Sequence, residues 1–92
     1  MQSVTGNSKE IILPEQFNEL QVQMVGSDMT YVWNLYKHNL KSTDIRLIQG
    51  YAGTTNPNYA SFYANNNRIK IDAFVEKNVS KTNSAVTTVW YR

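Results

Sequence analysis

Two runs of alternating apolar and polar residues, joined by three consecutive asparagines, constrain the fold of this chain more than any other feature of its sequence. In residues 59–65 and 68–76, apolar and polar side chains alternate with a period of two, which indicates β-strands with one buried face. Asparagine tolerates the left-handed backbone conformation that tight turns use, so residues 65–67 are predicted to join the strands as an antiparallel hairpin. The side chains expected to face the core are Ala60, Phe62, Ala64, Ile69, Ile71, Ala73 and Val75.

The rest of the chain repeats this pattern in short runs with turn residues between them. Further strands are predicted at residues 11–13, 18–25, 30–37, 45–52 and 86–92. In residues 18–25, apolar Leu20, Val22 and Met24 alternate with Gln21 and Gln23, which indicates a half-buried strand. In residues 30–37, Tyr31, Trp33 and Leu35 share one face, and Thr30, Val32, Asn34 and Tyr36 share the other. The register of the last strand stays open, because Trp90 and Tyr91 cannot both face the same core. No run sustains a helical period. These observations predict an all-β protein, an antiparallel β-sandwich of jelly-roll or Greek-key type with about six or seven strands.

The length of the chain, 92 residues, predicts a single domain. We expect this domain to cover residues 10–92, after a flexible tail or linker remnant at residues 1–9. The chain has no cysteine, so neither a disulfide nor a thiolate-bound metal can supplement a small core. Small domains without such cross-links often gain stability by association. We therefore expect a homo-oligomer.

The charges of the chain argue against nucleic acid as a partner. The net charge is +2, from nine basic and seven acidic residues spread along the sequence. Lys37, Lys41 and Arg46 come nearest to a basic cluster, but Asp44 lies among them, whereas nucleic-acid-binding domains concentrate basic residues on one face. Membrane insertion is not expected either, because no apolar run approaches the ~18 residues needed to span a bilayer. Only 17% of the residues are charged, and such polar, weakly charged surfaces are common in extracellular and virion β proteins.

No residue pattern predicts catalysis or a bound metal. The single histidine, His38, lies in a polar loop with Ser42 and Asp44, and so few neighbouring residues seldom preorganise a triad. The chain offers no His/Cys set for zinc, no spacing of a calcium-binding loop and no glycine-rich nucleotide motif. We therefore predict a non-enzymatic protein without metal or cofactor. Two carboxylates within about 10 Å of each other in a pocket would instead favour glycoside hydrolysis.

Outward aromatic and amide side chains are the positive functional signal. Tyr59 and Tyr63 are expected on the solvent face of their strand, and Tyr51 comes just before the turn at residues 53–58. Tyrosine offers a large, rigid contact surface with a polar end, while asparagine adds adaptable hydrogen bonds. The candidate ligand-binding residues are Tyr51, Thr54, Thr55, Asn56, Asn58, Tyr59 and Tyr63. The alternative is that the tyrosines cover a second sheet or a subunit interface.

Three short motifs give the chain a resemblance to a known family. The motifs are LPEQFNEL, a central GYAG and a terminal VTTVWYR. Their matching positions are Leu13, Pro14, Phe17, Glu19, Leu20, Gly50, Tyr51, Trp90, Tyr91 and Arg92. Over residues 10–92 the chain resembles small C-terminal domains of tail-fibre, baseplate and minor structural proteins of bacteriophages and prophages. Trp90 departs from the family, where tyrosine is commoner.

The resemblance implies a β-sandwich head on a virion appendage, often trimeric, that attaches to the host surface. A host-surface saccharide is then the expected partner, and the turn at residues 53–58 is the expected contact. The implied location is the virion tail. The alternative function is a stand-alone carbohydrate-binding or adhesin-type module of a bacterial surface protein, which would be extracellular or at the cell surface.

Overall fold

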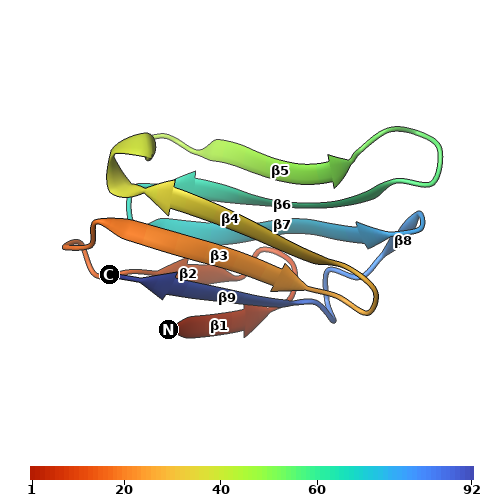
Figure 1. Cartoon of the computed structure of the whole chain (residues 1–92), viewed down its shortest axis with the longest axis horizontal. Helices are drawn as coiled ribbons and strands as arrows, with labels where there is room; N and C mark the ends of the chain where they lie inside the picture. The colour runs from red at the N-terminus through yellow and green to blue at the C-terminus, as the bar shows by residue number, and fades with distance from the viewer.

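The computed structural model describes all 92 residues as two antiparallel β-sheets packed face to face (Figure 1). The strand order in sheet I is β1 (Gln2–Thr5), β9 (Val86–Tyr91), β3 (Glu19–Val25) and β4 (Thr30–Tyr36). The order in sheet II is β2 (Glu10–Ile12), β7 (Arg68–Glu76), β6 (Asn58–Asn65) and β5 (Ile45–Tyr51), with β8 (Val79–Ser80) paired to β7. A 3₁₀ turn, η1 (Lys37–Asn39), follows β4. The molecule measures 40 × 21 × 19 Å, and the strands run along its long axis.

The predicted all-β architecture of antiparallel sheets is confirmed, but the structure has nine strands, more than the sequence predicted. β1 lies within residues 1–9, which were expected to be a tail; it pairs with β9, and Val4 packs against the core. β8 lies in the segment between β7 and β9 that was expected to be a polar loop. Neither strand is longer than four residues, so each shows too little alternation to be recognised. The structure contains no helix with the length and apolar character needed to cross a membrane.

The core lies between the two sheets. Its sixteen buried apolar residues are Ile11, Leu13, Phe17, Leu20, Val22, Met24, Tyr31, Trp33, Ala60, Phe62, Ala64, Ile69, Ile71, Phe74, Ala85 and Val89. Aromatic rings of β4 pack edge-on against rings of sheet II: the centroids of Trp33 and Phe62 are 4.9 Å apart, and those of Tyr31 and Phe74 are 5.7 Å apart. The half-buried pattern of β3 and the inward face predicted for β6 are therefore confirmed, and in β4 the face of Tyr31 and Trp33 is the buried one.

The inward face predicted for β7 is wrong in its second half. Ser61 pairs with Ala73 and Phe62 pairs with Ile71, so Asp72 is an extra residue opposite β6 and forms a β-bulge. Beyond the bulge the alternation reverses: Phe74 is fully buried, while Ala73, which was predicted to face the core, is only half-buried on the outer side. Val75 and Glu76 exchange their expected faces in the same way, and Glu76 is buried.

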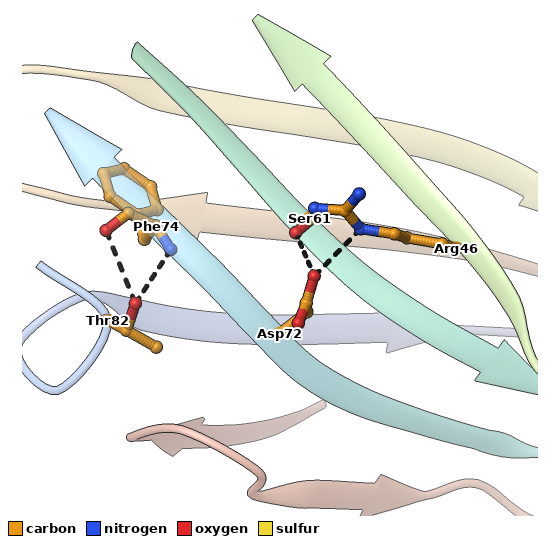
Figure 2. A network of polar contacts seen from close by, with 5 residues as sticks. All are labelled: Arg46, Ser61, Asp72, Phe74 and Thr82. Atoms are coloured by element: carbon orange, nitrogen blue, oxygen red, sulfur yellow. Dashed lines mark hydrogen bonds and ion pairs between the residues drawn. The ribbon is translucent and has the colours of Figure 1, made fainter. Parts of the chain in front are cut away.

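The carboxylate of Asp72 occupies the outer side of this bulge (Figure 2). Its Oδ2 accepts a hydrogen bond from Ser61 Oγ at 2.7 Å and forms an ion pair with Arg46 Nε at 3.0 Å. Ser61, on the outward side of β6, is fully buried, and its hydroxyl donates to this carboxylate. The bulge therefore links the three strands β5, β6 and β7 on the outer face of sheet II.

The segment after β7 continues sheet II. Lys77 and Asn78 both have positive φ angles, 49° and 64°, and form the tight turn into β8. Farther along, the backbone N–H of Phe74 donates to Thr82 Oγ1 at 3.0 Å, and the same hydroxyl lies 3.5 Å from the Phe74 carbonyl (Figure 2). The side chain of Thr82 thus makes the hydrogen bonds to the backbone of Phe74 that a neighbouring strand would otherwise make.

Buried Glu76 joins the two sheets. Its carboxylate accepts hydrogen bonds from the backbone N–H groups of Ser27 at 3.2 Å, Asp28 at 2.7 Å and Met29 at 2.8 Å. These three donors belong to the turn between β3 and β4, so a side chain of sheet II fixes a turn of sheet I. The turn approaches closely because Gly26 has no side chain; a Cβ there would collide with the Phe74 ring.

Candidate functional site

The structure places the sequence-predicted site residues in sheet II and in the loop that follows β5. Tyr51 pairs with Asn58 where β5 ends and β6 begins, and the loop of residues 52–57 joins the two strands at one end of the long axis (Figure 1). The exposed residues of this loop include Thr54, Thr55 and Asn56. The Tyr51 side chain is 55% exposed, but its ring lies so close to Gly53 that a Cβ there would collide with it. Part of this ring is therefore already in close contact with the loop.

Asn58 has a structural role in the same loop. Its Oδ1 accepts a hydrogen bond from the backbone N–H of Lys77 at 2.8 Å, and its Nδ2 donates to the carbonyl of Asn56 at 3.3 Å. The amide therefore holds the loop of residues 52–57 against the turn between β7 and β8. The acceptor oxygen and one N–H group of this amide are thus used within the protein.

Tyr59 and Tyr63 lie on the outer face of sheet II, as predicted, but both are half-buried. Four residues along one strand separate them by about 13 Å. Tyr59 pairs with Gly50 on one side and with Val75 on the other. Tyr63 lines a polar pocket of about 280 Å³ that contains no other residue of the predicted set. The structure thus separates Tyr63 from the loop, and a ligand-binding role for these residues stays a prediction.

A second group of exposed aromatic side chains lies on the outer face of sheet I. Near the opposite end of the long axis from the loop, β9, β3 and β4 run side by side (Figure 1). Pairing between these strands sets Trp90, Gln21 and Asn34 in one row across the sheet. Trp90 faces outward and is 38% exposed, while Tyr91 packs against the core. This arrangement settles the register that the sequence left open for the last strand.

The next row toward the end of the sheet consists of Arg92, Glu19 and Tyr36. Tyr36 pairs with Glu19, and the backbones of Glu19 and Arg92 exchange two hydrogen bonds of 3.1 Å. The side chain of Tyr36 is 55% exposed. Together the two rows border a pocket of about 430 Å³. We call this the Trp90–Tyr36 pocket, because these two aromatic residues stand at opposite corners of it.

The floor of the Trp90–Tyr36 pocket is made of amides. Gln21 Nε2 donates a hydrogen bond to Asn34 Oδ1 at 3.1 Å, which fixes the orientation of both side chains. This bond leaves the carbonyl oxygen of Gln21 free as an acceptor and the N–H groups of Asn34 free as donors. The pocket therefore offers both kinds of neutral hydrogen-bonding group to a ligand.

One wall of the pocket carries an ion pair. Arg92 Nε donates to Glu19 Oε1, and the side chains are 86% and 31% exposed respectively. The charges of this pair neutralise each other, while the outer nitrogens of the guanidinium remain available as donors. Glu19 is the only carboxylate that lines the pocket. Glycoside hydrolysis uses two carboxylates across a cleft, so this pocket lacks that arrangement.

Tyr36 is held in place by the turn that follows it. Its ring stacks on the imidazole of His38, with centroids 5.6 Å apart and planes 9° from parallel. Its backbone N–H donates to Asn39 Oδ1 at 3.0 Å, and Lys37 in the same turn lies 5.2 Å from the centre of the Phe17 ring. His38, which the sequence placed in a loop without a role, therefore supports an aromatic wall of the pocket. A preoriented ring loses little entropy when a ligand binds.

The outer face of sheet I is otherwise free of charge. Beyond the pocket, the outward positions of its four strands are Ser3, Thr5, Gln23, Val25, Thr30, Val32, Val86 and Thr88. A solvent-exposed sheet face usually carries Lys or Glu, so a face of hydroxyl, amide and aliphatic groups is unusual. Its only charged side chains are the paired Glu19 and Arg92 at its end. The surface therefore favours a neutral partner over a highly charged one.

Sequence reasoning missed the Trp90–Tyr36 pocket although it identified most of the local pattern. The outward positions of Gln21, Asn34 and Tyr36 follow from the alternation of their strands. The missing information was that β9 pairs beside β3, which brings Trp90 next to Gln21 from the other end of the chain. No short-range signal in the sequence reports such a pairing.

Comparison with protein-family models, with curated proteins and with solved structures found no match to this chain. The functional interpretation therefore depends on the residues and geometry of the site.

Proposed function

We propose that this protein is a non-enzymatic binding domain that holds a neutral saccharide in the Trp90–Tyr36 pocket. The observation that carries the proposal is the placement of two exposed aromatic rings at opposite corners of a patch whose centre is the hydrogen-bonded amide pair Gln21–Asn34. A sugar ring presents an apolar C–H face, which stacks on an aromatic ring, and hydroxyl groups, which pair with amides. The pocket supplies both complements side by side.

The absence of unpaired charge supports a neutral saccharide over other partners. A single-stranded nucleic acid also stacks on aromatic rings, but it requires a basic groove for its phosphates. Arg92 is the only cation that lines the pocket, and it is paired with Glu19. The contrast with the second pocket supports the same choice, since the polar pocket at Tyr63 is lined by four charged residues.

The wider setting of the proposal is attachment to a host surface as part of a virion appendage. Its support is the resemblance of the motifs around Leu13, Gly50 and Trp90 to phage tail-fibre and baseplate domains, which also implies a trimer and a jelly-roll or Greek-key type of sandwich. Several copies on one particle would raise avidity although each site binds weakly. A stand-alone carbohydrate-binding or adhesin-type module of a bacterial surface would use the same pocket, and genomic neighbours that encode tail proteins would distinguish the two settings.

Titration with a panel of uncharged oligosaccharides tests the proposal. We expect the fluorescence of exposed Trp90 to change on binding and Trp90→Ala or Tyr36→Ala to weaken affinity about tenfold or more, a loss of about 1.4 kcal/mol or more. The matched control is Tyr59→Ser with Tyr63→Ser, which removes two outward aromatics from sheet II and should leave affinity unchanged. Circular dichroism verifies that each variant is folded.

Two results would contradict this function. If no uncharged oligosaccharide binds, or if Trp90→Ala and Tyr36→Ala bind as the wild type does, the pocket is not a saccharide site. If only the Tyr59 and Tyr63 variant loses binding, the residues first predicted from the sequence form the true site.

A further inference from the structure

The edge strands of the two sheets differ in how their open sides are occupied. On β4, at the edge of sheet I, the carbonyl of Val32 accepts a hydrogen bond from Gln49 Nε2 at 2.5 Å. On β2, at the edge of sheet II, the carbonyl of Ile12 accepts one from Gln2 Nε2 at 3.0 Å. These side chains occupy backbone groups that an added strand would need. Such covering protects a sheet edge from pairing with another chain.

β5, the other edge of sheet II, has no such cover. The backbone of its seven residues forms hydrogen bonds with β6, and no side chain or backbone group of the protein bonds to its open side. β1 is also uncovered, but it has only four residues. In Figure 1, β5 is the outermost strand on its side of the molecule, beyond β4. A partner strand could therefore reach it without displacing another part of the chain.

The only charged side chain of β5 is turned away from this edge. An outward arginine on an edge strand commonly discourages pairing. Here the guanidinium of Arg46 extends across β6 to Asp72, with Nε 3.0 Å from Oδ2 (Figure 2). Ser61 donates to the same oxygen and fixes the acceptor. The ion pair on the outer face thus holds the guanidinium away from the open side of β5, where its charge would discourage pairing.

We propose that β5 is a self-association edge, where two copies of the chain pair antiparallel about Ile48 so that sheet II continues through the dimer. In this register Ile48 faces Ile48 of the second copy, and its side chain, now 42% exposed, becomes covered. Arg46 faces Gly50 of the second copy, so a long side chain meets one without a Cβ and no like charges stand opposite each other.

The twofold axis of such a pair is perpendicular to the sheet, and both copies therefore present sheet I on the same side. Two Trp90–Tyr36 pockets would then face one surface together. This consequence rests on the proposed saccharide-binding function, whereas the pairing of β5 does not. A single strand pair buries less than the ~1,600 Å² of a standard interface, so we expect a weak, concentration-dependent dimer in place of the trimer that the family resemblance implies.

Sedimentation of the full chain from about 10 μM to about 1 mM, the range in which a small interface dissociates, tests the pairing. The wild type should change from monomer to dimer over this range. Ile48→Lys should remain monomeric, because two like charges would face each other at the axis. The matched control is Val79→Lys, a similar change at a 52% exposed valine of β8, which should dimerise as the wild type does.

Disulfide trapping tests the register. The chain has no cysteine, so Ile48→Cys introduces a single thiol. Directly opposite residues of antiparallel strands have Cα atoms about 4.5–5.5 Å apart, within the range that a disulfide spans. With oxidised glutathione we expect a covalent dimer for Ile48→Cys and none for Val32→Cys, its control on the covered edge of β4. A wild-type monomer at every concentration, a trimer, or a dimer that survives Ile48→Lys while the Ile48→Cys variant fails to cross-link would overturn the proposal.

Discussion

At the scale of single residues, Glu76 shows how a buried charge can strengthen a fold. Burial by itself would raise the pKa of this carboxyl group. Hydrogen bonds from the backbone N–H groups of Asp28, Met29 and Ser27, together with the charge of Lys81, outweigh burial and lower the pKa of Glu76 below its ordinary value of 4.5. The ionised form is therefore the one that the native structure favours.

Replacing this carboxylate should destabilise the protein strongly. We expect Glu76→Gln to lower the free energy of unfolding by about 2–3 kcal/mol, because the amide cannot serve three backbone donors as a carboxylate does. Urea denaturation followed by circular dichroism measures the change. Glu10→Gln is the control, since its exposed ion pair with Arg68 spans 3.6 Å and such pairs contribute about 0–1 kcal/mol. Equal effects of the two changes would refute a special role for Glu76.

The lowered pKa of Glu76 predicts how the stability of the protein changes with pH. Its pKa is lower in the folded chain than in the unfolded chain, so its contribution is fully present above pH 4.5 and is lost as the pH falls through the folded-state pKa. The difference in stability between the wild type and Glu76→Gln should therefore shrink on acidification below this pH. A difference that stays constant down to the acid limit would contradict the shift.

At the scale of elements, the bulge in β7 decides which side chains fill the core. We expect Phe74→Ala to cost about 3–5 kcal/mol, because it leaves a large cavity between the sheets. Val75→Ala should cost about 1 kcal/mol or less, since Val75 is half-buried on the outer face. Thermal unfolding of the two variants provides the measurement. The order of these effects reverses if the strand keeps the unbroken alternation that its sequence suggests.

The same bulge marks the limit of what alternation predicts. Period-two alternation holds throughout β3, β4 and β6 because none of these strands carries an extra residue, so Val22, Trp33 and Phe62 all face the core. In β7 the pattern holds as far as Ile71, and Asp72 then shifts every later residue by one position. The local sequence does not indicate the bulge, because the side chains that stabilise it, Ser61 and Arg46, lie on two other strands. A bulge that is stabilised by side chains of neighbouring strands can be recognised only from the tertiary structure.

The candidate site was predictable to a similar degree. Alternation placed Tyr36 and Asn34 on one face of their strand, and composition indicated a weakly charged surface with aromatic residues for recognition. The sequence could not indicate which strand lies next to β3. The prediction therefore fell on Tyr59 and Tyr63, which lie close together along a single strand. Trp90 joins Gln21 only through the pairing of β9 with β3.

At the scale of the whole molecule, the first and last strands close sheet I. β1 pairs with β9 over four residues, Val4 packs on the core, and Gln2 covers the edge of β2 through the carbonyl of Ile12. The segment expected to be a tail therefore covers the otherwise open edge of β9. Since β9 also carries Trp90, the pairing of β1 with β9 helps to hold the strand that forms part of the Trp90–Tyr36 pocket.

Removal of residues 1–6 should accordingly weaken the entire sandwich. We expect unfolding to be easier by about 1–2 kcal/mol from the lost partial burial of Val4 alone, which lowers the melting temperature by roughly 4–8 °C for each kcal/mol. Val4→Ser in the full chain is the matched control, because it loses the side chain but keeps the strand. If the truncated chain aggregates more than Val4→Ser at equal stability, the newly exposed edges of β9 and β2 are responsible. An unchanged melting temperature after truncation would show that β1 adds nothing to the fold.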